Sequence, residues 1–163
     1  MEMEKEKYEE YYRRLYRFVL LQVKNPAEAE DIVQEVFYQY IKAGISFGTE
    51  QEETAWLWKV AANLCRKLWR SAWYRKTRPV EEWKGFTIET AESAVLSAER
   101  QKAVLKEVQN LPIKYRQVVL LYYFEEMNIR EMAKVLQRQE STIQTQLQRA
   151  RELLGRKLEG EWR

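Results

Sequence analysis

The chain has 163 residues, of which 45% are hydrophobic and 33% charged, enough to bury the core of one ordinary domain or two small ones. Only 5 residues are glycine and 3 are proline, so we expect an all-α protein with long, unbroken helices. A membrane span needs about 18 consecutive apolar residues, and the chain has no such run. Cys65 is the single cysteine and cannot form an internal disulfide, which suits the reducing cytoplasm.

The net charge of +3 hides an uneven distribution along the chain. Residues 1–53 carry 7 basic and 12 acidic side chains, whereas residues 54–79 carry 7 basic side chains and no acidic one. Residues 138–163 are again basic, with a net charge of +2. An acidic segment beside two basic ones indicates at least two kinds of partner, one of them a polyanion. The charged N-terminus resembles no export signal, so we expect a cytoplasmic protein that is not an integral membrane protein.

Two amphipathic helices are predicted in the acidic segment. Apolar residues recur at three- and four-residue steps over residues 8–23, and Asn25 with Pro26 marks the end of this first helix. The second helix is predicted over residues 27–43. Its expected core stripe contains Ala29, Ile32, Val33, Val36, Phe37, Tyr40 and Ile41. Its opposite face carries Glu28, Asp31, Gln34, Glu35 and Gln39. Without histidine there is no Glu-x-x-His pattern, so we expect a partner-facing or solvated surface and no metal site.

A third helix, predicted over residues 51–76, carries the basic segment. A loop with two glycines precedes it, at residues 44–49. One face of this helix combines an aromatic ring, an amide and cations: Trp56, Lys59, Asn63, Arg66, Lys67 and Arg70. Cations follow phosphates, and flat rings and amides engage unstacked bases, so this face favours single-stranded nucleic acid. Further aromatic surface is expected from Trp58, Trp69, Trp73 and Tyr74, with a core position for the tryptophans as the alternative.

A second domain follows a predicted linker. Pro79 and Gly85 interrupt the helical pattern in residues 77–92, so we expect domains at residues 1–76 and 93–163. Helix is predicted again from about residue 94, and a boundary falls at residues 110–112. The next helix, residues 113–126, is strongly apolar and is expected at the centre of the second core.

Residues 128–156 have the pattern of a helix-turn-helix. A short apolar stripe over residues 129–136 is followed by a polar break and then by a second stripe, Ile143, Leu147, Ala150 and Leu154. The outward face of the second helix carries Ser141, Gln144, Thr145, Gln148 and Arg149. Hydroxyl, amide and guanidinium groups are those that read base edges and bind phosphates. The alternative is an ordinary helical hairpin with a solvated face.

These motifs together resemble the extracytoplasmic-function (ECF) sigma factors of bacterial RNA polymerase. Residues 29–37, Phe47 and residues 55–64 are similar to sigma region two, and residues 111–124 and 129–154 to region four. The resemblance covers nearly the whole chain, with both regions in the expected order. It implies two small helical domains joined by a linker, the second a helix-turn-helix domain of the winged-helix-like class.

The resemblance also implies roles for the candidate residues. Asp31, Gln34 and Glu35 match the segment that docks on the clamp helices of the β′ subunit of core RNA polymerase. The β subunit of the polymerase is a further expected contact. The loop at residues 46–53, which includes Phe47, and Asn63 together match the pocket that captures a flipped base of the −10 element. Lys59, Arg66, Lys67 and Arg70 match positions near the opened promoter strand. Trp56, on the same face of the third helix, is predicted to bind the −10 element with them. Gln144, Thr145, Gln148 and Arg149 match the recognition-helix positions that face the −35 major groove. Ser141, on the same outward face, is predicted to bind the −35 element with them. The implied mechanism is binding without catalysis or cofactors, under control of an anti-sigma factor.

The sequence departs from the family pattern at the turn of the helix-turn-helix. Gln137 and Arg138 stand where the family usually has glycine and an aliphatic residue, and Gln139 replaces a common serine cap. Gln144 and Gln146 replace frequent lysine or arginine, which predicts weaker electrostatic binding of the −35 element. Gln144 and Gln148 could instead read adenines by paired hydrogen bonds.

Two other classes of protein remain possible from the sequence. A DNA-binding regulator that never joins polymerase would bind duplex DNA tightly by itself, usually as a dimer on a palindrome. A helical protein-interaction module would bind polymerase or another partner without supporting transcription. The acidic face of the second helix disfavours the regulator, and the basic aromatic face of the third disfavours the interaction module.

Overall fold

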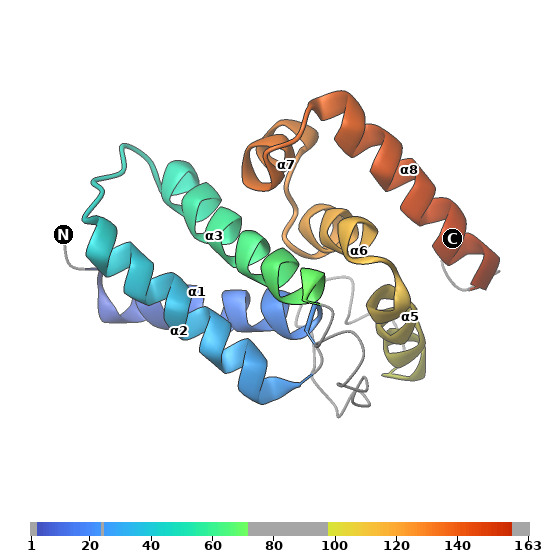
Figure 1. Cartoon of the computed structure of the whole chain (residues 1–163), viewed down its shortest axis with the longest axis horizontal. Coiled ribbons are helices and arrows are strands. Elements are labelled where there is room, and N and C mark those ends of the chain that lie inside the picture. Colours follow the sequence, from blue (N-terminus) through green and yellow to red (C-terminus); the bar gives the residue numbers. More distant parts are fainter. Residues whose placement is uncertain (1–2, 24, 72–97, 158–163) are drawn as a thin grey trace. The chain divides into compact units, whose positions relative to one another are not determined.

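The computed structural model describes residues 3–23, 25–71 and 98–157, and the described residues form helices joined by turns and loops (Figure 1). They fall into two compact units. Helices α1 (Lys5–Leu20), α2 (Pro26–Ala43) and α3 (Glu50–Arg70) form the first unit. The second contains α5 (Ala98–Asn110), α6 (Ile113–Val119), the π-helical turn η1 (Leu120–Phe124), most of α7 (Ile129–Leu136) and α8 (Glu140–Lys157). The predicted linker over residues 77–92 lies outside the described residues.

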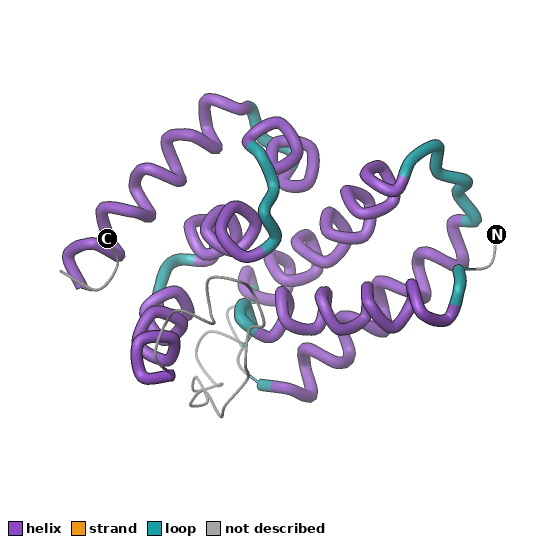
Figure 2. The backbone as a smooth tube through the Cα atoms, turned by 180° about the vertical axis from the view of Figure 1, so that it is seen from behind, coloured by secondary structure: helices purple, strands orange, loops and turns teal. Residues whose placement is uncertain are grey.

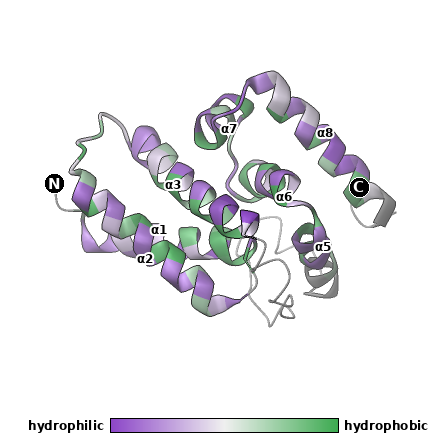
Figure 3. Ribbon diagram, viewed as in Figure 1, coloured by the Kyte–Doolittle hydropathy of each residue, from purple (hydrophilic) through white to green (hydrophobic). Residues whose placement is uncertain are grey.

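The three helices of the first unit pack against one another around an apolar core. Hydrophobic and hydrophilic residues alternate along them at helical spacing (Figure 3). The core contains Tyr11, Leu15, Phe18, Val19, Ala29, Val33, Val36, Leu57, Trp58, Ala61, Ala62 and Cys65. The helices begin where capping side chains permit: the backbone N–H of Glu28 donates to Asn25 Oδ1 at 2.9 Å, and that of Glu52 to Thr49 Oγ1 at 3.1 Å.

Two sequence predictions in this unit need correction. Ile41 was expected in the core stripe of α2, but its side chain is 78% exposed. Tyr8, in the first turn of α1, packs against Phe37 with ring centroids 4.7 Å apart, so α1 begins too late in the chain to cover the next turn of α2. The third helix also ends sooner than predicted, because Ser71 has extended backbone angles.

A buried carboxylate links all three helices of this unit. Glu53 on α3 is 7% exposed and accepts hydrogen bonds from Tyr11 Oη on α1 at 3.1 Å and from Tyr40 Oη on α2 at 2.7 Å. Lys7 Nζ lies 2.9 Å from the same carboxylate. Burial by itself would raise the pKa of Glu53, but the hydrogen bonds from Lys7, Tyr40 and Tyr11 outweigh it and lower that pKa. The cluster therefore holds an ionised carboxylate at the three-helix junction.

In the second unit, α6 packs against α8, and α5 against both. The sequence predicted one continuous helix over residues 113–126, whereas the helix widens into a π turn after Val119. The backbone N–H of Glu125 donates to the carbonyl of Leu120 at 3.0 Å, five residues back. Within the described part of this unit there is no strand that would form a wing, and across the described residues no helix is long and apolar enough to span a membrane.

Candidate functional site

The acidic face predicted on α2 is exposed. Asp31, Gln34 and Glu35 all lie at the surface. Gln39 Nε2 donates to Glu35 Oε2 at 2.8 Å, a bond along the helix surface that leaves the face open to a partner. The same row continues into large apolar side chains, because Tyr38 is 60% exposed and Ile41 follows three residues later. The exposed surface of α2 is therefore acidic in its first half and apolar in its second.

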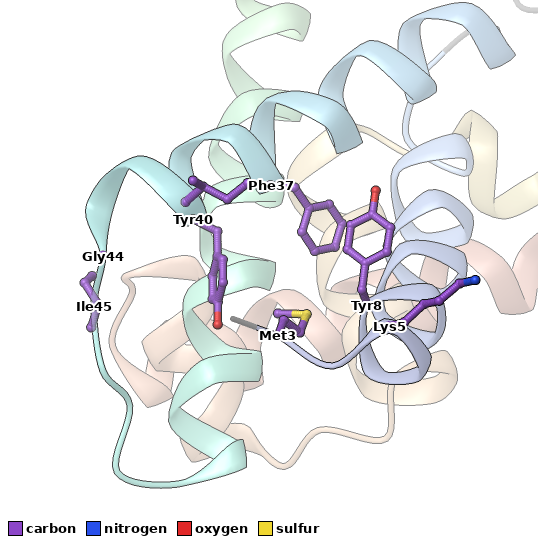
Figure 4. Close-up of a pocket in the computed structure, with 8 residues that line it drawn as sticks. Met3, Lys5, Tyr8, Phe37, Tyr40, Gly44 and Ile45 are labelled. Atoms are coloured by element: carbon purple, nitrogen blue, oxygen red, sulfur yellow. The ribbon is translucent and has the colours of Figure 1, made fainter. Parts of the chain in front are cut away.

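A hollow of about 640 Å³ lies beside this apolar half of α2 (Figure 4). It is lined by Met3, Lys5, Tyr8, Phe37, Tyr40, Ile41, Gly44 and Ile45. Gly44 ends α2 in the left-handed region, with φ of 58°, a conformation that glycine adopts without strain. The chain turns there into the loop that leads to α3, drawn in teal in Figure 2.

Three aromatic rings meet where this loop joins α2 and α3. Phe47 in the loop packs on Tyr40 and Trp56, with centroid distances of 6.1 Å to each, and the Tyr40 and Trp56 rings are 6.0 Å apart. Because Tyr40 also donates to the buried Glu53, the aromatic cluster is tied to the three-helix junction. The loop is therefore held by packing, and Phe47 and Trp56 remain partly accessible.

The polar and basic side chains of α3 follow the same side of the helix as Trp56. Lys59, Asn63 and Arg66 are partly exposed, and Lys67 and Arg70 are exposed. The guanidinium of Arg66 donates to Asn63 Oδ1, so the two side chains are held together one turn apart. The structure thus places all six predicted residues of α3 at the surface, in a row that continues the aromatic cluster.

Two tryptophans expected to enlarge this surface have structural positions. Trp58 is completely buried, packed edge-on against Tyr11 at 6.1 Å and covered by the guanidinium of Arg14 at 4.7 Å. The indole N–H of Trp69 donates to the carbonyl of Gln22, which joins the end of α3 to the segment after α1. Trp73 and Tyr74 lie outside the described residues.

The helix-turn-helix begins with a reciprocal cap. Asn128 Oδ1 accepts the backbone N–H of Glu131 at 2.8 Å, and Glu131 Oε1 accepts that of Asn128 at 3.0 Å. The turn follows α7 through a Schellman motif, in which the N–H of Arg138 donates to the carbonyl of Ala133 at 3.1 Å. Gln137 occupies the left-handed position of that motif, with φ of 54°. The atypical glutamine therefore adopts the conformation for which glycine is the usual residue.

Replacing Gln137 with glycine is expected to stabilise the protein by about 0.5–1 kcal/mol. Glycine removes the Cβ that disfavours the left-handed conformation, and its greater freedom in the unfolded chain offsets part of this gain. We expect the midpoint of thermal unfolding, followed by circular dichroism, to rise by roughly 4 °C. Gln137→Ala keeps the Cβ and serves as the control without a gain. Equal midpoints for the glycine and alanine variants would contradict strain at this position.

Arg138, the second atypical residue of the turn, connects the turn to α8 and α6 by hydrogen bonds. Its Nη1 donates to Gln146 Oε1 on α8 at 2.7 Å, and its Nη2 to Gln117 Oε1 on α6 at 3.5 Å. Gln117 is completely buried, so the guanidinium supplies a partner for an amide inside the core. Gln146 therefore makes an internal contact of the domain. The two departures from the family pattern are paired: glutamine replaces a basic residue at position 146, and arginine replaces an aliphatic residue at position 138, so the cation now comes from the turn.

The outward face of α8 contains the five predicted residues. Ser141, Gln144, Thr145, Gln148 and Arg149 are all exposed, while Ile143, Leu147, Ala150 and Leu154 are buried. The Thr145 hydroxyl donates to the Ser141 carbonyl at 3.0 Å, which fixes one hydroxyl on the helix surface. In the described part of the chain, no three His, Cys, Asp or Glu side chains gather as possible metal ligands. The exposed polar groups of α8 are suited to hydrogen bonding with a flat or grooved partner.

Comparison with known families matches both units. The sequence model of Sigma-70 region 2 covers residues 8–75, and that of Sigma-70 region 4 covers residues 101–154. The chain belongs to the sigma-70 family. This sigma factor is 29% identical over 158 residues to the ECF RNA polymerase sigma factor SigW of Bacillus subtilis, with 91% of this chain and 84% of SigW covered. It is also 29% identical over 150 residues to SigM of the same species, with 90% of each chain covered, so it is an ECF-type sigma factor.

A solved structure agrees with the fold of the sigma factor. The sigma factor RpoE of Bartonella quintana, crystallised with the anti-sigma factor NepR, superposes with a TM-score of 0.75 over 96% of each chain at 16% identity. At this identity the similarity concerns the fold alone, and it confirms the predicted all-α architecture. The region-two and region-four domains are assigned by the two sequence models.

Two side chains at these surfaces were not among the residues predicted from the sequence to bind a partner. Tyr38 lies three residues after Glu35 and three before Ile41, so helical spacing alone could have placed it on the acidic row. Tyr40 was assigned to the core stripe, but its ring completes the aromatic cluster with Phe47 and Trp56. No spacing rule indicates that contact, because the three residues come from two helices and a loop.

Proposed function

We propose that this ECF sigma factor joins bacterial core RNA polymerase and directs it to promoters through two helical domains. Residues 1–76 would bind polymerase and the −10 element, residues 93–163 the −35 element, and residues 77–92 would connect them. The observation that carries this proposal is the separation of an acidic exposed face on α2 from a basic, aromatic face on α3. The protein would act by binding, and polymerase would supply the catalysis.

The polymerase-binding surface would be the exposed row of α2. Asp31, Gln34 and Glu35 supply charge and hydrogen-bonding groups, which suit a basic helix of the β′ clamp. We extend this surface to Tyr38 and Ile41, because exposed aromatic and aliphatic side chains beside a charged rim are typical of the centre of a protein interface.

The −10 element would bind along α3 and the preceding loop. Phe47 and Trp56 offer partly exposed rings on which an unstacked base can pack, and Asn63 offers an amide held by Arg66. Lys59, Lys67 and Arg70 would neutralise phosphates of the opened strand. Extruding a base costs a few kcal/mol, so a loop already fixed by the aromatic cluster would lower the free energy needed to capture it.

The −35 element would be read by α8. Its exposed hydroxyl and amide groups suit base edges in the major groove, and Arg149 suits phosphate or guanine. Of the two glutamines that replace common basic residues, Gln144 is exposed and Gln146 is held by Arg138. The weaker electrostatic binding expected from these replacements would therefore concern Gln144 most directly.

Replacing Gln148 with alanine is expected to relax base preference within the −35 element by about tenfold, since a paired hydrogen bond discriminates by about 1–3 kcal/mol. Run-off transcription on promoters mutated at each −35 position measures this preference. Gln146→Ala is the matched control, because the Gln146 side chain pairs with Arg138 within the domain. A base-reading role for Gln148 is excluded if its alanine variant keeps the wild-type preference at every position.

Run-off transcription with purified core RNA polymerase on a genomic library tests the proposed function as a whole. We expect transcripts that appear only when this protein is added and that share −10 and −35 sequences. A DNA-binding regulator would instead bind duplex DNA tightly without polymerase, usually as a dimer. A library that yields no dependent transcript, together with tight duplex binding by the chain alone, would overturn the sigma-factor function in favour of the regulator.

Regulation by an anti-sigma factor is part of the proposal. The structurally similar RpoE of Bartonella quintana was crystallised with such a partner. An anti-sigma factor for this chain would cover the exposed row of α2 and so exclude polymerase. Because its partners would be core polymerase and promoter DNA, we place the protein in the cytoplasm.

A further inference from the structure

An arginine in the second unit is held by two consecutive tyrosines. Arg151 on α8 donates from Nε to Tyr123 Oη at 2.7 Å. Its guanidinium carbon lies 5.4 Å from the centre of the Tyr122 ring and 5.7 Å from that of Tyr123. The two rings are perpendicular to each other, with centroids 4.9 Å apart. The guanidinium is therefore fixed by one hydrogen bond and two aromatic contacts.

The π turn η1 supplies this aromatic pair. In η1, Leu120 and Leu121 are buried, while Tyr122 and Tyr123 are only partly covered. The wider turn thus places two consecutive leucines in the core and the next two residues at the surface beside α8. Single π turns within helices occur frequently at functional sites.

Arg151 has the chemistry of an anion-binding group. It is exposed, and its contacts in the described part of the chain are with the two tyrosines and with no carboxylate. A guanidinium has five N–H donors, of which the bond to Tyr123 uses one. A planar guanidinium with donors in excess fits a phosphate better than it fits a single acceptor.

The position of Arg151 on α8 connects it to the proposed −35 surface. It follows Gln144 and Gln148 at spacings of seven and three residues, which places all three on one side of the helix. A helix rises 1.5 Å per residue, so Arg151 lies about 4.5 Å further along the axis than Gln148. When the glutamines face base edges, the next position along the row reaches the wall of the groove, where the phosphates lie.

We propose that Arg151, positioned by Tyr122 and Tyr123, binds a backbone phosphate of duplex DNA at the edge of the −35 major groove. This inference rests on the proposed −35 recognition by α8. Its ligand is the sugar–phosphate backbone, so the contact adds affinity and fixes the register of α8 without reading sequence. A cation held in place loses less conformational freedom on binding than a mobile one.

The alternative is a structural clasp, in which Arg151 only joins α8 to η1. The salt dependence of DNA binding separates the two roles, because each phosphate contact adds about 0.9 to the slope of log affinity against log salt concentration. A clasp affects folding stability and has no such slope. Tyr123→Phe breaks the hydrogen bond but keeps the charge, whereas Arg151→Gln removes the charge.

The test uses holoenzyme, the full chain with core polymerase, and a short duplex that carries only the −35 element of a promoter found by run-off transcription. Binding is followed by fluorescence anisotropy across a series of potassium chloride concentrations. We expect the slope to fall by about 0.9 for Arg151→Gln and to stay unchanged for Tyr123→Phe. The charge-matched control is Lys106→Gln, an exposed residue of α5, for which no change of slope is expected.

Three outcomes would overturn the proposal. A wild-type slope for Arg151→Gln would show that the residue touches no phosphate. Equal losses of affinity for Arg151→Gln and Tyr123→Phe, with both slopes unchanged and the unfolding midpoints lowered, would assign the cluster to a clasp. Wild-type holoenzyme that binds the −35 duplex no better than a scrambled duplex would remove the −35 recognition on which the inference rests. Arg151→Lys, which keeps the charge, should retain the wild-type slope with weaker binding.

Discussion

Replacing Glu53 with leucine is expected to lower the free energy of unfolding by about 2–4 kcal/mol. The carboxylate of Glu53 accepts hydrogen bonds from Tyr11 and Tyr40 and pairs with Lys7, so one substitution removes contacts that join α1, α2 and α3. A hydrogen bond to a charged group contributes about 1.5–3 kcal/mol, and Tyr11 is left buried with Thr54 as its remaining hydroxyl partner. Urea unfolding followed by circular dichroism measures the loss.

Glu50 offers the matched control for this substitution. It lies in the first turn of the same helix but is exposed, so Glu50→Leu should change the free energy of unfolding by less than about 0.5 kcal/mol. A loss below about 1 kcal/mol for Glu53→Leu would contradict a stabilising role for the cluster. The substitution should also weaken −10 recognition, because Tyr40 connects Glu53 to the aromatic cluster with Phe47 and Trp56.

The Glu53 cluster also predicts how stability depends on pH. The pKa of Glu53 is lowered in the folded state from its usual 4.5, so its contribution is complete above pH 4.5 and is lost as the pH falls through the folded pKa. Burial and the hydrogen bond to Glu53 raise the pKa of Tyr40 from 10 to about 12. That contribution is complete below pH 10 and is lost as the pH rises through about 12. Glu53→Gln should remove the contribution of this group, so urea titrations at several pH values should show a smaller loss of stability on the acid side.

Reversing the charge of Glu35 is expected to weaken binding to core RNA polymerase by about 10- to 100-fold. Glu35 is exposed on the row of α2 that we assign to polymerase, and its lysine variant would place a cation against the basic partner expected there. Such a loss corresponds to about 1.4–2.8 kcal/mol of binding free energy. Titration of labelled protein with purified core polymerase, monitored by fluorescence anisotropy, gives the dissociation constant.

Two further variants define the boundaries of this surface. Glu10→Lys on α1 makes the same change of charge at another exposed position, and it should leave core affinity within about twofold of wild type. Ile41→Ser removes an exposed apolar side chain, so it should reduce core affinity several-fold without lowering stability. Equal losses for Glu35→Lys and Glu10→Lys would indicate an effect of overall charge, and the assignment of the α2 row to polymerase would then be wrong.

Much of this protein follows from local sequence patterns. The 3.6-residue period determines which side chains share a helix face, and it correctly placed Asp31, Glu35 and Gln148 at the surface. Asn25 and Pro26 marked a helix boundary because their preferences act on the adjacent backbone alone. These signals need no partner element, so they can be predicted before the fold is known.

Other features were decided only when helices met. Trp56 and Trp58 lie two residues apart on α3, and the helical period alone does not determine which of the two rings is buried. Tyr11 and Arg14 pack on Trp58 and bury it. Ile41 is exposed because α1 begins too late in the chain to cover the last turn of α2.

The remaining contacts join residues far apart in the sequence. Arg138 reaches Gln117 across 21 positions, and Arg151 reaches Tyr123 across 28. Local periodicity carries no information about such pairs, because they depend on how α6 packs against α8 and on the π turn between α6 and α7. Local patterns of residues specify the helices and their exposed faces, whereas packing between the helices selects which exposed cations are held in place.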